Sequence, residues 1–179
     1  MNNFLKTVNG VVNMGWFLKM FGIRAKEEID SICLNMDLPH WEVQGPKTFS
    51  ELFSALEGWL PLGSIMYFEG GSPDDEIEKF MKLHAISGKV NIASGTLWPR
   101  PMSFHIPATT LTIHELATIM DHHAEPELAI HFHIYKDKEL LFQWYDAFSD
   151  PILINGDVSE EQIICFTDKI GKKFKKIEK

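Results

Sequence analysis

Cysteine is scarce in this sequence: only Cys33 and Cys165 occur in 179 residues, and they lie far apart without a Cys-x-x-Cys spacing. A secreted chain of this size would usually carry more disulfide-forming cysteines. This scarcity argues against a disulfide-rich secreted scaffold. It predicts a reducing, cytoplasmic compartment.

A basic leader and an unbroken hydrophobic run are missing as well. Asn9, Asn13 and Lys19 interrupt the apolar N-terminal segment, residues 1–23, and no small-residue cleavage site follows it. A membrane span needs about 20 predominantly apolar residues. We expect neither a signal peptide nor a membrane span.

Common catalytic patterns are also lacking. There is no Gly-x-Ser-x-Gly motif, and both cysteines lie on predicted apolar helix stripes. His114 and Glu115 are not followed by the second histidine of a His-Glu-x-x-His helix. The turn at 70–73 precedes a predicted helix start, but its acidic neighbours would repel a phosphate. The sequence therefore favours a non-enzymatic protein.

Positive charge is in short supply outside the C-terminus, and the net charge is −8 at pH 7. Residues 168–179 contain six Lys and two acidic residues, so they carry +4 and the rest of the chain carries −12. An acidic body argues against a nucleic-acid-binding face. It favours a basic protein partner, or serves solubility alone.

Length and composition predict a single domain over residues 1–179 in three parts. Residues 1–62 are expected to be helical, 63–156 to contain β-α-β-β repeats, and 157–179 to form a C-terminal helix. Apolar residues make up 45% and charged residues 23%, as in an ordinary globular protein. We see no linker that would divide the chain.

Helices are predicted over 3–21, over 25–36 and from Thr48, where Thr48-x-x-Glu51 forms a capping box. The first is apolar on too many sides for an isolated surface helix, so it is expected to pack across the domain. The alternative is a docking helix or one that forms a homodimer. Residues 40–47 are predicted to be a loop.

The centre of the chain contains what we interpret as a unit used twice. The first copy contains a strand over 64–68, a helix over 74–85 that starts at Ser72-Pro73, and strand segments over 89–93 and 96–98. A strand over 102–106 and a helix over 113–124, with a box at Thr112, make the second. An offset of 39 residues places His84-Ala85 on His123-Ala124; both histidines are interpreted as packed side chains.

These elements predict an α+β fold. We expect a mostly antiparallel sheet of about five or six strands, with tandem β-α-β-β units that form a ferredoxin-like centre. A short strand at the sheet edge is predicted over 152–154. The last helix starts at the capping box Ser159-x-x-Gln162 and keeps an apolar stripe to Ile177.

A β-hairpin is predicted over 128–148, with Asp137 and Lys138 as a two-residue turn. That register pairs Lys136 with Glu139, His133 with Phe142 and His131 with Trp144. One face then holds the side chains His131, His133, Tyr135, Leu140, Phe142 and Trp144. The other face is more purely apolar and is assigned to the core, so the histidine face is expected to be exposed.

The histidines suggest an alternative function. His131 and His133 alternate along a strand and so point the same way, a geometry suited to Zn²⁺, with His105 as a third ligand. Glu115 would then act as the general base of a metal-dependent hydrolase. The competing interpretation is that these side chains pack among the aromatic residues and bind no cofactor.

The leading hypothesis is an acidic domain that binds another, basic protein, such as an inhibitor or immunity-type protein. Trp98 and Arg100, held extended by flanking prolines, are candidate contact residues because Trp and Arg dominate protein interfaces. The dense acidic cluster and the exposed hairpin aromatics complete the candidate set. They are Glu69, Asp74, Asp75, Glu76, Tyr135 and Trp144.

Overall fold

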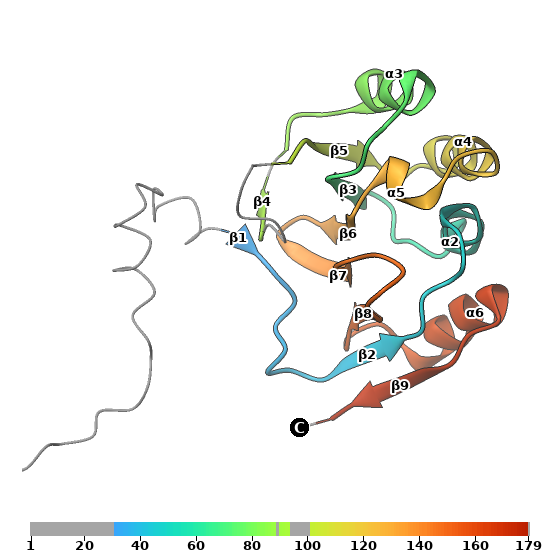
Figure 1. Cartoon of the computed structure of the whole chain (residues 1–179). Helices are drawn as coiled ribbons and strands as arrows, with labels where there is room; N and C mark the ends of the chain where they lie inside the picture. Colours follow the sequence, from blue (N-terminus) through green and yellow to red (C-terminus); the bar gives the residue numbers. More distant parts are fainter. Residues whose placement is uncertain (1–30, 89, 94–100, 179) are drawn as a thin grey trace, which may run out of the picture.

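A seven-stranded antiparallel sheet organises the computed structural model, which describes residues 31–88, 90–93 and 101–178 (Figure 1). The strand order is β5-β3-β6-β7-β8-β2-β9. These strands are β2 (His40–Val43), β3 (Ile65–Glu69), β5 (Ser103–Pro107), β6 (His131–Lys136), β7 (Glu139–Trp144), β8 (Ile152–Asn155) and β9 (Phe174–Ile177). The predicted α+β class and antiparallel sheet are confirmed.

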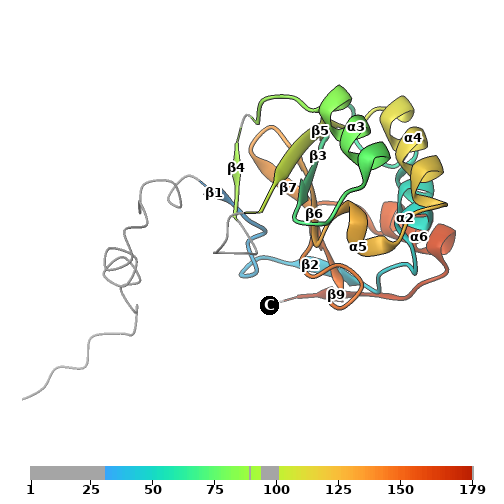
Figure 2. The same ribbon diagram turned by 45° about the horizontal axis from the view of Figure 1, so that its top comes forward.

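Helices cover one face of this sheet, and a small parallel pair of strands lies on the other side (Figures 1 and 2). The helices are α2 (Phe49–Leu56), α3 (Asp75–His84), α4 (Thr110–Met120), α5 (Glu125–Leu128) and α6 (Glu160–Ile170). The small pair consists of β1 (Ser31–Ile32) and β4 (Asn91–Ile92).

Two apolar clusters fill the spaces on either side of the sheet. The larger lies under the helices and includes Phe53, Phe132 and Phe142, which are all fully buried. The smaller joins Leu34 and Ile92, beside the small pair, to Tyr135 and other side chains of the large sheet. The second sheet face is therefore covered in part by β1 and β4. Segments 3–21 and 25–30, where helices were predicted, lie outside the described residues.

Helix starts follow the capping chemistry of the sequence, with two shifts. Thr48 caps α2 and accepts a hydrogen bond from the Glu51 backbone, and Ser159 with Gln162 forms the capping box of α6, both as predicted. Asp74 rather than Ser72 caps α3, and Thr109 rather than Thr112 caps α4. In both helices the side-chain oxygen of the observed N-cap residue accepts hydrogen bonds from backbone N–H groups of the first turn, which have no partner within the helix.

Two N-terminal predictions are wrong within the described residues. Ser31 and Ile32 form a strand instead of the middle of the helix predicted over 25–36, since they pair in parallel with β4. Residues 40–43 form β2 instead of a loop, because β8 and β9 pair with both of its edges. The predicted edge strand at 152–154 is β8, which lies inside the sheet between β7 and β2.

The C-terminal helix is shorter than predicted. Gly171 adopts a left-handed conformation with φ 62°, and the Lys172 N–H bonds to the Thr167 carbonyl, which ends α6. Phe174 and Ile177 consequently lie on β9 and not on a helical stripe. The glycine decides the outcome, since only it adopts φ > 0 without a steric penalty.

The described residues contain no ferredoxin-like unit. The strand that follows α3 is β4, which pairs with β1 in the small sheet and not with β3, so α3 does not connect two paired parallel strands. The predicted tandem β-α-β interpretation is wrong for this first copy. The sequence repeat instead relates α3 to α4, which lie side by side and run in opposite directions (Figure 1).

The hairpin is present, but its register changes at one position. Lys136 pairs with Glu139 and Tyr135 with Leu140, as predicted for an Asp137-Lys138 turn. A β-bulge then shifts the pairing, so that Ile134 lies opposite Phe142 and Phe132 opposite Trp144. One extra residue, Leu141, moves Phe142 and Trp144 to the helical face.

Candidate functional site

An exposed group of carboxylates marks the start of α3, and we call Asp74, Asp75, Glu76 and Glu78 the acidic surface. The Asp74 side chain accepts hydrogen bonds from the backbone N–H groups of Glu76 and Ile77, at 3.1 and 3.0 Å. Carboxylates in a first turn also complement the helix dipole. The side chains of Asp74, Glu76 and Glu78 remain 50%, 64% and 40% exposed.

The structure separates Glu69 from the acidic surface. Glu69 lies on β3, is fully buried, and accepts a hydrogen bond from the Tyr67 hydroxyl at 2.9 Å. Burial, together with the nearby Glu69 carboxylate, raises the pKa of Tyr67. Glu69 thus belongs to the interior and not to a contact surface.

Two histidine–carboxylate contacts connect α3 and α4. His123 Nε2, just beyond the end of α4, lies 3.0 Å from Asp74 Oδ2 and 3.7 Å from Glu76 Oε2. At the other end of the pair, His84 Nε2 of α3 lies 2.9 Å from Glu115 Oε2 of α4, without hydrogen-bond alignment. Glu76 and His84 lie 39 positions before Glu115 and His123, but the shorter contact of His123 is with Asp74, which has no carboxylate at the matching position, Ile113.

The electrostatics of the first contact favour the charged forms. Hydrogen bonds to the backbone of Ile77 and to His123 lower the pKa of Asp74. Hydrogen bonds to the Ile119 carbonyl and to Asp74 raise the pKa of His123. This pair therefore anchors one edge of the acidic surface to α4.

A shallow hollow of about 510 Å³ runs along the exposed side of α3. Asp75, Glu78, Lys79, Lys82 and Leu83 line it. Glu78 forms an ion pair with Lys82 at 2.7 Å, and Leu83 is 73% exposed. The hollow thus combines carboxylates with an exposed apolar side chain.

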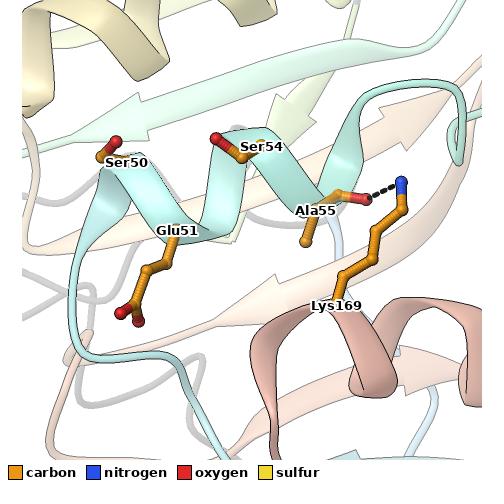
Figure 3. Close-up of a pocket in the computed structure, with 5 residues that line it drawn as sticks. All are labelled: Ser50, Glu51, Ser54, Ala55 and Lys169. Atoms are coloured by element: carbon orange, nitrogen blue, oxygen red, sulfur yellow. Dashed lines mark hydrogen bonds between the residues drawn. The ribbon is translucent and has the colours of Figure 1, made fainter.

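A second hollow, of about 400 Å³, lies between α2 and α6 (Figure 3). The Lys169 ammonium lies 3.2 Å from the Ala55 carbonyl and 3.0 Å from the Glu57 carbonyl. These are unpaired carbonyls at the end of α2, so the lysine caps that helix. Because it holds a helix end, we assign Lys169 a structural role.

The histidine face of the hairpin is buried, contrary to expectation. His131 is 7% exposed and His133 0%. Asp146 N donates to His131 Nδ1 at 2.9 Å, and Trp144 N donates to His133 Nδ1 at 3.3 Å. A histidine can bind a metal through either ring nitrogen. In both of these histidines, one of the two, Nδ1, already accepts a hydrogen bond from a backbone amide.

The third predicted ligand, His105, lies on β5, with β3 between it and β6. Its Nδ1 lies 2.9 Å from the Tyr135 hydroxyl, and burial lowers its pKa. Among the described residues, no three His, Cys, Asp or Glu side chains come together in a way that could hold a metal ion. The three predicted ligands are thus not brought together as a metal site.

The remaining candidate residues fall into two groups. Tyr135 and Trp144 are fully buried, so the expectation that they are exposed is wrong. The bulge explains Trp144, and the cover provided by the small pair explains Tyr135. Trp98 and Arg100 lie outside the described residues.

Sequence reasoning missed the role of His123. The 39-residue offset marked the relationship between His84 and His123, but it predicted packing for both. Only the antiparallel placement of α3 and α4 brings each histidine onto a carboxylate of the other helix. That placement depends on the order of β3 and β5, which the local sequence does not specify.

The fold is an α+β arrangement with a seven-stranded antiparallel sheet, helices on one face and a small parallel pair. Comparison of the chain with protein-family models, curated proteins and solved structures gives no match. None of the helices in the described parts of the chain has the length and apolar character needed to cross a bilayer.

Proposed function

We propose that this protein is a non-enzymatic binding domain that recognises a basic region of another protein through the acidic surface. The supporting observation is that Asp75 and Glu76 are exposed while Asp74 is fixed by hydrogen bonds to α3 and α4. Because Asp74 is held in place, it loses little freedom when a cationic partner arrives.

The surroundings of the acidic surface support a protein partner. Leu83 and the neighbouring hollow on α3 provide apolar contact area beside the charges. Charge complementarity mainly increases the association rate and selects the partner, while apolar contacts slow dissociation. An inhibitor or immunity-type protein acting on a basic target has this division of roles.

The test compares two double variants that change the charge equally. Asp75→Asn/Glu76→Gln removes two charges from the acidic surface but keeps the Asp74 cap. Glu160→Gln/Glu161→Gln removes two exposed charges from the first turn of α6. The partner is first captured from source cells with the wild-type protein and purified, and its Kd is then measured by calorimetry.

We expect the α3 variant to weaken binding about tenfold at low ionic strength and less at high salt. The α6 control should change the Kd less than about twofold. Equal effects of both variants would indicate a response to net charge alone. That result, or no effect of the α3 variant, would overturn the proposal.

A further inference from the structure

Both ring nitrogens of His123 face hydrogen-bond acceptors. Nδ1 lies 2.8 Å from the Ile119 carbonyl oxygen and Nε2 lies 3.0 Å from Asp74 Oδ2. A neutral imidazole has one N–H, whereas the protonated ring has two. Neither a backbone carbonyl nor an ionised carboxylate can donate, so both contacts are hydrogen bonds at the same time only in the imidazolium form.

The surroundings of the ring supply negative charge from three directions. Asp74 and Glu76 approach from the start of α3, and Glu127 of α5 adds to the field. Asp121 and His122 directly precede His123 in the chain, and both are exposed; the Asp121 carboxylate accepts a hydrogen bond from the Ser50 hydroxyl. The Ile119 carbonyl belongs to the last turn of α4, the negative end of that helix dipole. A positive charge is therefore favoured here.

One proton completes a continuous set of hydrogen bonds. It runs from the Ile119 carbonyl of α4 through the His123 ring to Asp74, and from Asp74 to the N–H groups of Glu76 and Ile77 in α3. The side chain of His123 is only 10% exposed, so water has limited access to replace a lost bond. The first turn of α3 is thus connected to α4 through a titratable group.

We propose that His123 is a proton-dependent link between α3 and α4 that regulates the acidic surface. When the ring loses its proton, one of its two hydrogen bonds is lost, and the acidic surface loses a neighbouring positive charge. The remaining N–H can serve Asp74 or the Ile119 carbonyl but not both, so the connection between α3 and α4 is weakened and the first turn of α3 opens more often. The regulatory consequence rests on the proposed function, but the link itself can be tested without a partner.

The first measurement is the protonation of the His123 ring by ¹H–¹⁵N NMR between pH 5 and 9. We expect both ring nitrogens to carry a proton at neutral pH, with a pKa above the usual value of 6.5. Asp74→Asn, which keeps a capping side chain, should lower that pKa. His122→Gln, on the same turn, should leave it unchanged.

The second measurement is hydrogen exchange at the Glu76 and Ile77 amides, corrected for intrinsic exchange rates. We expect protection to fall about three- to tenfold as His123 deprotonates, as for loss of one charged hydrogen bond near the surface. His123→Gln should show low protection at all pH values. The link would be overturned if the His123 ring carried only one proton at neutral pH. It would also be overturned if protection of the Glu76 and Ile77 amides did not change as His123 titrates.

The regulatory part is tested separately by the association rate with the purified basic partner. The rate should rise with pH across the His123 titration in the wild type and stay flat in His123→Gln. If the association rate of the wild type does not change with pH while NMR confirms the protonated His123 ring, regulation is overturned and the link is not. A partner that binds without using the acidic surface would overturn the proposed function and leave the link standing.

Discussion

His133 accepts a hydrogen bond from the Trp144 backbone N–H, with 3.3 Å between Nδ1 and the amide nitrogen. The proton of the neutral ring is therefore on Nε2, which is buried and has no hydrogen-bond partner among the described residues. The ring stacks on Tyr67 with 5.8 Å between centroids and meets the edge of Tyr145 at 4.8 Å. This environment solvates a neutral imidazole poorly and a charged one worse.

The first prediction concerns acid stability. Burial, with a smaller effect of the neighbouring His131, lowers the pKa of His133 to about 3. Below an unfolded-state pKa of about 6.5, the unfolded chain binds a proton that the folded chain does not. Stability should therefore fall as the pH drops from about 6.5 toward 3, by about 1.4 kcal/mol per pH unit from this group.

Urea denaturation between pH 4.5 and 7 measures this effect. Glutamine does not titrate, so in His133→Gln the free energy of unfolding should change less steeply with pH than in the wild type. The difference in slope should correspond to about one proton. His114→Gln, on the exposed side of α4, is the control for replacing a histidine with glutamine. Parallel profiles for His133→Gln and the wild type would mean that His133 is protonated in the folded protein.

The second prediction concerns the buried Tyr67–Glu69 hydrogen bond. Tyr67→Phe removes the hydroxyl donor but leaves the carboxylate fully buried. We expect the free energy of unfolding at pH 7 to fall by about 1–3 kcal/mol. Tyr145→Phe serves as the control, since that hydroxyl donates to the part-buried backbone carbonyl of Ala93. An equal or smaller loss for Tyr67→Phe would contradict this account.

The third prediction concerns Gly156, which follows β8. A Cβ atom at this position would collide with the Pro39 carbonyl, immediately before β2. Gly156→Ala should therefore force β2 and β8 apart and lower the free energy of unfolding by about 2–3 kcal/mol, measured in urea. Gly63→Ala, in open space at φ +86°, should cost only about 1 kcal/mol from its backbone conformation.

The fourth prediction concerns the outer edge of β9. Lys175 and Lys176 are exposed on this last strand of the sheet, where charge discourages pairing with another chain. Lys175→Thr/Lys176→Thr should increase self-association in light scattering. It also removes the Lys175–Glu42 ion pair and the contact of Lys176 with the Trp41 ring, so we expect the free energy of unfolding to fall by about 1 kcal/mol. Lys172→Thr/Lys173→Thr, outside the strand, makes the same charge change and should remain as the wild type. Matching behaviour of the two variants would show that net charge is responsible.

Local chemistry predicted the starts of α2 and α6 and the hairpin turn correctly. Thr48, Ser159 and the Asp137-Lys138 turn act over a few residues, so the sequence specifies them directly. The position of β2 is different, because its partners β8 and β9 lie far along the chain. No short window shows that residues 40–43 will have two neighbouring strands.

The candidate site was predicted only in part, for a related reason. The exposed carboxylates of Asp74, Asp75 and Glu76 follow from their place at a helix start. The burial of Tyr135 and Trp144 does not, since the single extra residue at Leu141 reverses the faces of β7. Both the bulge and the small β1–β4 pair depend on tertiary packing.

The position of β2 in the sheet also affects how the chain folds during its synthesis. Synthesis proceeds from the N-terminus, so β2 emerges early, while both strands that flank it emerge much later. Until β8 and β9 are made, the apolar side chains of Trp41 and Val43 are not buried against the sheet, and both edges of β2 lack a paired strand. The sheet is complete only when β2 pairs with strands from the C-terminal part of the chain. Such long-range pairing makes folding slow, and chaperones can bind the nascent chain in the meantime.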